Sequence, residues 1–147
     1  MLSDGDQIRN LLGAYCEHID LADYAAVGAL FGHDGVLATE DGLPLARGAD
    51  AIAAFYAGTV KLHDGAQRTK HLVTNTVLDE DDAGITARSS FVVLQATRDL
   101  PLQPIMAGRY VDRFERVPVG DGTGWRWVER RFIPDLVGHL SQHLGQL

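Results

Sequence analysis

The sequence predicts an α+β fold in which helices come first and a curved, mostly antiparallel sheet follows. Within the first 61 residues, apolar side chains recur at three- and four-residue spacing, which is the period of amphipathic helices. From residue 70 onward the segments are rich in Val, Ile, Thr and aromatic residues, which are typical of strands. Because short turns separate these later segments, neighbouring strands should pair antiparallel, without the strand–helix alternation of α/β proteins.

Three helices and a small hairpin are expected in the N-terminal half. The first helix covers residues 7–19, and a second, shorter helix follows Asp23. Residues 36–47 are typical of a hairpin, because they contain an Asp-Gly dipeptide that favours a tight turn. The third helix covers about residues 49–61 and turns one apolar stripe inward: Ile52, Phe55, Tyr56 and Val60.

Four strands are expected in the C-terminal half, before a short tail. They cover residues 70–79, 85–97, 105–118 and 124–133, and the turns between them cover residues 80–84, 98–104 and 119–124. The segment 135–147 is expected to be a C-terminal tail or a short helix. A length of 147 residues suits a single domain, residues 1–147, and is hardly enough for two.

Composition narrows the class of protein. Apolar residues make up 46% and charged residues 22%, which is typical of a soluble globular protein. The net charge of −7 disfavours a nucleic-acid partner, and no apolar run is long enough for a membrane span. The single cysteine, Cys16, excludes an intrachain disulfide and fits a reducing compartment. Since the N-terminus also lacks the pattern of a secretory signal, a cytoplasmic location is expected.

Asp20 and His71 are the strongest candidates for chemistry, although they lie far apart in the sequence. Asp20 ends the first expected helix, and His71 opens the first long strand, on the same face as Val73 and Asn75. If the two met, the carboxylate would hold one ring nitrogen and leave the other as a base near neutral pH. The alternative is that Asp20 caps the following turn and His71 is a surface histidine or a hydrogen-bonded core histidine.

Other candidate patterns have simpler structural explanations. His139 and His143 have the spacing of a metal-binding pair on a helix, but a third ligand is missing, so both are expected to be solvated. Cys16 is expected to be a small buried side chain. The sequence has no phosphate-binding glycine loop and no nucleophilic serine elbow. No metal and no cofactor are therefore expected.

Five segments occur in an order and at a spacing that point to a known family. They are YCEHIDLADYAAVGALF (15–31), RGADAIAAFY (47–56), RTKHLVTN (68–75), GRYVDRF (108–114) and GWRWVERRFIPD (124–135). Together they resemble the SnoaL-like branch of the nuclear transport factor 2-like superfamily, over about residues 7–135. The resemblance implies a cone, in which a strongly curved antiparallel sheet wraps around the N-terminal helices and encloses a deep pocket.

The relatives implied by this resemblance include scytalone dehydratase, bile-acid 7α-dehydratase and hexachlorocyclohexane dehydrochlorinase. In that comparison Asp20 and His71 match a catalytic aspartate–histidine pair, and Tyr15 matches an active-site tyrosine of the bile-acid enzyme. Two departures disfavour scytalone-type dehydration in detail. Ile19 stands where that enzyme has a tyrosine, and Ala107 or a neighbour stands where it has a second histidine.

The resemblance leaves two classes of function open. One is a cofactor-independent lyase or isomerase acting on a small, largely apolar cyclic substrate. There His71 would remove a proton, Asp20 would stabilise the imidazolium, and Tyr15 would hydrogen-bond a substrate oxygen. The other is a non-catalytic small-molecule-binding or accessory protein that uses the same pocket. The candidate substrate-binding residues, taken mostly from strand alternation, are Phe55, Val73, Asn75, Tyr110 and Asp112.

Association with further copies of the chain is also expected, as a dimer or trimer. Proteins of this fold usually present the outer sheet face to a partner copy, and a mixed surface here offers Thr74, Arg88, Arg109 and Val111. The arginines of the late strands could supply a donor to an oxyanion, but most are expected in solvent or at an interface: Arg109, Arg113, Arg126, Arg130 and Arg131.

Overall fold

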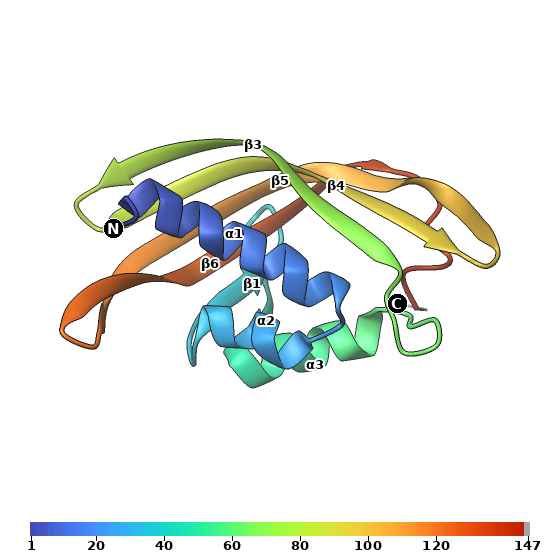
Figure 1. Ribbon diagram of the computed structural model, residues 1–147, viewed down its shortest axis with the longest axis horizontal. Coiled ribbons are helices and arrows are strands. Elements are labelled where there is room, and N and C mark those ends of the chain that lie inside the picture. Colours follow the sequence, from blue (N-terminus) through green and yellow to red (C-terminus); the bar gives the residue numbers. More distant parts are fainter. Residues whose placement is uncertain (146–147) are drawn as a thin grey trace.

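The computed structural model describes residues 1–145 and shows three helices packed under one curved sheet (Figure 1). The helices are α1 (Asp4–Asp20), α2 (Tyr24–Phe31) and α3 (Ala49–Thr59). The strands of the sheet are β1 (Val36–Ala38), β2 (Pro44–Arg47), β3 (Thr69–Asp81), β4 (Gly84–Thr97), β5 (Leu100–Val119) and β6 (Gly122–Val137).

Within residues 1–145 the strands form one sheet in the order β2-β1-β6-β5-β4-β3. Neighbours pair antiparallel, except that β1 and β6 run parallel. Figure 1 shows α1 lying across the sheet beneath its long strands, with α2 and α3 further from it. The sheet does not close on itself, so β3 is left as an edge strand beside α1. The α+β fold, with a curved sheet around N-terminal helices, is confirmed.

Helix α1 begins and ends at strong local signals. Ser3 and Asp6 form a reciprocal capping box at its start, which satisfies backbone N–H groups that the first turn leaves free. The helix ends at Asp20, and Ala22 then takes a left-handed conformation with φ of 56°. Asp23 caps α2 by accepting a hydrogen bond from the Ala26 N–H at 3.1 Å. Asp20 is therefore free of any capping role in α2, and its carboxylate is available to another element.

The interior of the cone is filled by large side chains. The buried stripe of α1 packs against residues from α2, α3 and the sheet, and the stripe consists of Ile8, Leu12, Tyr15 and Ile19. The Trp127 ring lies at the centre, stacked on Phe31 at 5.1 Å and tilted against Phe114 at 4.8 Å between centroids. A second cluster, around Phe91 and Tyr110, continues the core toward the other end of the sheet. Aromatic burial on this scale is a main source of stability in a chain of this length.

Two of the register shifts in the sheet change which side chains of β3 and β6 point into the cone. In β3 the register shifts between Val73 and Thr76, so that Asn75 and Val77 are exposed although His71 and Val73 are half-buried. A second shift lies where Arg113 and Phe114 of β5 meet β6. An extra residue in one strand reverses the in–out alternation beyond it. Simple alternation from the sequence therefore fails beyond each bulge.

Several expected boundaries shift by a few residues, since the turns expected at 80–84 and 119–124 are shorter in the structure, and two differences are larger. Residues 100–104 were expected to be turn, but β5 begins at Leu100, so the turn is confined to Arg98 and Asp99. The described part of the expected tail forms no helix, since β6 continues to Val137 and residues 141–143 make a turn. Residues 146–147 of that segment lie outside the described residues. None of the described helices is both long and apolar enough to cross a membrane.

Because α2 packs closely on α3, adding a single methyl group at their contact should strongly destabilise the protein. A Cβ on Gly28 would lie 2.2 Å from the Ala49 carbonyl oxygen, so Gly28→Ala should lower the free energy of unfolding by about 2 kcal/mol or more. Gly13 is the matched control, because a Cβ there meets nothing within 4 Å and Gly13→Ala should gain up to about 1 kcal/mol of helix stability. Urea unfolding followed by tryptophan fluorescence measures both. Equal stability of the two variants would contradict this packing.

Candidate functional site

The structure brings Asp20 and His71 together at the end of α1. Asp20 Oδ1 lies 2.7 Å from Nδ1 of His71, and both side chains are about nine-tenths buried. The His71 backbone N–H also donates to the carboxylate, at 3.0 Å to Oδ2 and 3.2 Å to Oδ1. Asp20, the last residue of α1, thus holds the start of the edge strand β3 through both the backbone and the side chain of His71.

The hydrogen bonds around Asp20 assign the His71 tautomer. The Thr69 hydroxyl is 2.9 Å from Asp20 Oδ1 and donates to it, so this oxygen serves as an acceptor. An ionised carboxylate can only accept hydrogen bonds, which requires the Nδ1 nitrogen of His71 to carry the proton. In the neutral ring Nε2 then carries the lone pair. This nitrogen, which lies on the opposite side of the ring from Asp20, can accept a hydrogen bond or a proton.

A groove between α1 and β3 reaches His71. Its volume is about 430 Å³, which falls within the usual range for small-molecule sites. The helix contributes one wall and the edge strand the other, with the β3 bulge in the groove. The lining residues are Arg9, Leu12, Gly13, Cys16, His71, Leu72, Val73, Thr74 and Thr76. The resemblance implied a deep pocket inside the cone, but side chains fill that interior, and the hollow beside His71 lies at the sheet edge.

The expected substrate-binding residues fall in different places. Val73 lines the groove beside His71. Asn75 is exposed and does not line it, because the β3 bulge turns it outward, so its expected inward position is wrong. Phe55 packs against Tyr56 within α3, and Tyr110 is buried against Phe91 in the second core cluster. Neither Phe55 nor Tyr110 is in the groove wall.

Asp112 is buried in an ion pair with Arg130 instead of lining the groove. The Arg130 guanidinium donates from Nε at 2.8 Å and from Nη2 at 3.0 Å to the two carboxylate oxygens, and Trp127 Nε1 donates at 2.9 Å. Burial disfavours the charge on Arg130, but the attraction of Asp112 outweighs this and holds the pKa of Arg130 above its usual value. Arg130 therefore remains charged inside the cone.

Arg130 also lies over three aromatic rings. It is buried, whereas the other four late arginines stay partly or fully exposed, so the expectation that most of them lie in solvent or at an interface fails for Arg130 alone. Its guanidinium carbon is 3.6 Å from the ring centroid of Tyr110, 4.2 Å from that of Tyr15 and 4.8 Å from that of Trp127. Its Nη1 is a buried donor without a partner among residues 1–145. The bulge between β5 and β6 accounts for its inward position, since simple alternation from Trp127 would place residue 130 on the outer face.

Tyr15 is in the interior, behind the dyad. Its hydroxyl is hydrogen-bonded to that of Tyr56, and burial raises the pKa of both phenols. It does not line the groove, so its expected role as a donor to a substrate oxygen finds no support in its position. Cys16, one residue on, does line the groove, and burial raises the pKa of its thiol to about 11. Cys16 is thus a neutral thiol near pH 7 and a poor nucleophile.

His143 is a site neighbour that the sequence pattern missed. It was expected to be solvated with His139, but its side chain is buried, and its ring centroid lies 6.3 Å from that of His71. Backbone hydrogen bonds hold this part of the tail against the segment after α3, from Lys61 N to His143 O at 2.8 Å and from Gly145 N to Thr59 O at 2.9 Å. His139 remains exposed. Among the described residues, no group of three or more His, Cys, Asp or Glu side chains could hold a metal ion.

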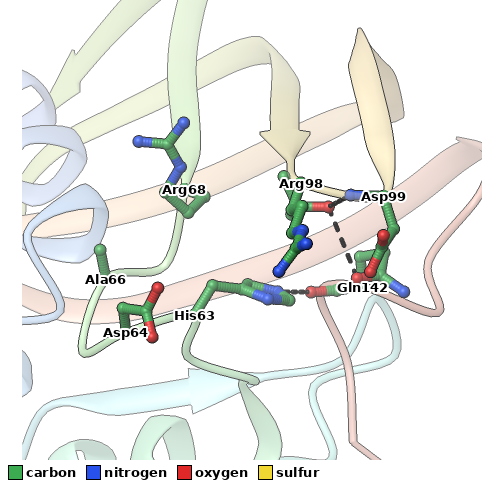
Figure 2. Close-up of a pocket in the computed structure, with 8 residues that line it drawn as sticks. His63, Asp64, Ala66, Arg68, Arg98, Asp99 and Gln142 are labelled. Atoms are coloured by element: carbon green, nitrogen blue, oxygen red, sulfur yellow. Dashed lines mark hydrogen bonds between the residues drawn. The ribbon is translucent and has the colours of Figure 1, made fainter.

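A larger, more polar hollow of about 660 Å³ lies at the end of the sheet where the tail crosses (Figure 2). Figure 2 shows His63 hydrogen-bonded to the Gln142 carbonyl, at 2.6 Å, with Arg98 beside them. Neither Asp20 nor His71 lines this hollow, and its charged side chains include both arginines and aspartates. The smaller groove is therefore the better candidate site, because it reaches His71 of the Asp20–His71 pair.

Fold and site together define a class of protein: a small α+β cone with a site compatible with small-molecule binding or catalysis. The chain belongs to the family of SnoaL-like domains, whose model matches residues 1–131. The comparison with curated proteins gives no match.

Solved structures of similar fold support this assignment. An NTF2-like protein with a cystatin-like fold from Novosphingobium aromaticivorans is 27% identical, with a TM-score of 0.72, over 87% of this chain and 79% of that one. Rv3472 from Mycobacterium tuberculosis is also 27% identical, with a TM-score of 0.70, over 88% of this chain and 70% of that one. ActVI-ORFA from Streptomyces coelicolor, at 23% identity and a TM-score of 0.72 over 88% and 96% of the two chains, shares the fold.

The buried His143 predicts a loss of stability at mildly acidic pH. Burial lowers its pKa from 6.5 to about 4, with a further lowering from the charges of His71 and His63 and an opposing effect from Asp20. Between these two values the unfolded chain binds the proton more readily, so the free energy of unfolding should fall as pH drops through this window. The total loss from this group should be about 3 kcal/mol.

Urea unfolding at pH 7 and pH 4.5 measures this effect. His143→Gln removes the titrating group, so its stability should depend less on pH than that of the natural chain. His139→Gln is the matched control on the same tail, because His139 is exposed, and it should leave the pH dependence unchanged. If His143→Gln and His139→Gln showed the same pH dependence of stability, the burial assigned to His143 would be contradicted.

Proposed function

We propose that the protein is a cofactor-independent lyase or isomerase that removes a proton from carbon in a small, largely apolar cyclic substrate. The observation that carries the proposal is the His71 ring, which lines the groove and whose Nδ1 lies 2.7 Å from Asp20 Oδ1. A histidine oriented in this way by a carboxylate is suited to general base catalysis.

The chemistry assigned to the pair balances without a further reagent. The Nε2 lone pair of His71 takes the proton, and the electrons of the broken C–H bond form a new double bond in the substrate. In an elimination the leaving group departs with its bonding electrons, and the imidazolium can return the proton to it. In an isomerisation the proton returns to a different carbon. Asp20 stays ionised and stabilises the imidazolium in both cases.

The groove supports a small substrate of one or two rings. About 430 Å³ is enough for such a molecule, and Leu12, Leu72 and Val73 provide apolar contact. Arg9 and the Thr74 hydroxyl supply polar groups that can orient it. The neutral Cys16 thiol disfavours a covalent intermediate on sulfur.

Deuterium exchange of 2-tetralone in D₂O tests the proposal, because proton removal from carbon is the first half of both reactions. The loss of its α-proton signal, followed by NMR, should be faster with the protein present. His71→Gln and Asp20→Asn should each reduce the catalysed rate by about 10²- to 10⁴-fold, the usual contribution of a positioned base. His139→Gln is the control and should retain the rate.

The rival function is a binding or accessory protein that uses the same groove without chemistry. Fluorescence titration with 2-naphthol, a planar analogue of the enol of 2-tetralone, separates the two. Binding of 2-naphthol without any His71-dependent exchange across a panel of cyclic ketones would favour the rival. Exchange that persists in His71→Gln would contradict the assigned base.

A further inference from the structure

A chain of buried hydrogen bonds leads from α2 to the Asp20 carboxylate. The Tyr24 hydroxyl donates to Gln67 Oε1 at 2.9 Å, and Gln67 Nε2 donates to Thr69 Oγ1 at 2.9 Å. The Thr69 hydroxyl in turn donates to Asp20 Oδ1 at 2.9 Å, the oxygen that also accepts from His71. Tyr24, Gln67 and Thr69 are all buried, with Gln67 completely so.

The donors of this chain all run in one direction. The Gln67 amide accepts through its oxygen, so its nitrogen must be the donor to Thr69, and the single hydroxyl proton of Thr69 is left for Asp20. Hydrogen bonds aligned in this way polarise one another and favour the ionised form of the acceptor at their end. The chain therefore stabilises negative charge on the oxygen that orients His71.

The elements that supply the chain are themselves fixed in place. Gln67 lies just before β3, and its backbone carbonyl accepts from Gln95 Nε2 at 3.3 Å. The same Gln95 nitrogen donates to the Gln142 carbonyl of the C-terminal tail at 3.0 Å. Tyr24 is the first residue of α2, and its ring stacks on Tyr56 of α3 at 5.9 Å between centroids. Thr69 is thus held between a rigid amide and the carboxylate.

We propose that Thr69, supported by Gln67 and Tyr24, is a positioning residue that orients Asp20 and sets the basicity of His71. The proposal deepens the function proposed above and rests on it for its catalytic consequence. The Thr69 hydroxyl stabilises the negative charge of Asp20 by donating a hydrogen bond to it. Removing this hydroxyl therefore leaves a more basic carboxylate. That carboxylate binds the imidazolium more strongly, and His71 then becomes protonated at a higher pH.

NMR titration of the His71 ring protons in the ligand-free protein tests this role. Thr69→Val keeps the shape of the side chain and removes the donor, so the titration midpoint should rise by about half a pH unit. Thr69→Ser retains the donor and should restore the natural midpoint. Tyr24→Phe removes a donor that lies two hydrogen bonds further along the chain, so it should raise the midpoint by a smaller amount.

Thr76→Val is the matched control. Thr76 lies on the same strand, but its hydroxyl hydrogen-bonds Ser89 at 3.0 Å instead of Asp20. Among residues 1–145, the titratable and charged groups near His71 are Asp20 from α1, Arg9 and Cys16 in the groove, and His143 from the tail. None of these variants changes them. A loss of stability alone would not shift the midpoint, so the readout separates positioning from packing.

The outcomes distinguish this proposal from the proposed function. The positioning role is supported if the midpoint rises in Thr69→Val, returns in Thr69→Ser and stays unchanged in Thr76→Val. This holds even if no ketone exchanges its protons, and in that case only the proposed catalytic function fails. Equal midpoints in Thr69→Val, Tyr24→Phe and Thr76→Val would overturn the positioning role, even if 2-tetralone exchange depends on His71.

Discussion

The site depends on the hydrogen bonds that the Asp20 carboxylate accepts. Asp20 ends α1, where the negative pole of the helix dipole disfavours a further negative charge, so it needs donors from elsewhere. Thr69 and His71 supply them from the start of β3, through a hydroxyl, a backbone N–H and a ring nitrogen. One carboxylate therefore attaches the edge strand to the helix, orients the histidine and aligns the two walls of the groove.

The interior of the cone has a different role from the one that its shape suggests. The ion pair of Asp112 and Arg130, with the Tyr15, Tyr110 and Trp127 rings around it, occupies the space under the sheet. Breaking such a buried pair typically costs about 3–5 kcal/mol, because the remaining charge is left without a partner. The interior is thus occupied by this pair and its rings, and the groove that reaches His71 lies at the sheet edge.

The fold was predictable because hydrophobic periodicity and turn residues agree along most of the chain. The meeting of Asp20 with His71 was inferred from residue type and family resemblance, and the structure shows the contact. Orientation beyond the bulges was not predictable, since one extra residue reverses a strand's faces, which is why Asn75 was misplaced. Arg130 was expected in solvent from its residue type, and the bulge in β6 turns it inward. His143 was missed because its burial comes from the tail packing against distant residues, and no local pattern encodes such contacts.

A crystal structure with bound 2-naphthol would test the central claim most directly, namely that the groove between α1 and β3 is the site and His71 its base. The account predicts the naphthol rings against Leu12 and Val73, with the hydroxyl within about 3 Å of His71 Nε2. Density for 2-naphthol in the polar hollow beside His63 and Arg98, with the groove empty, would contradict it.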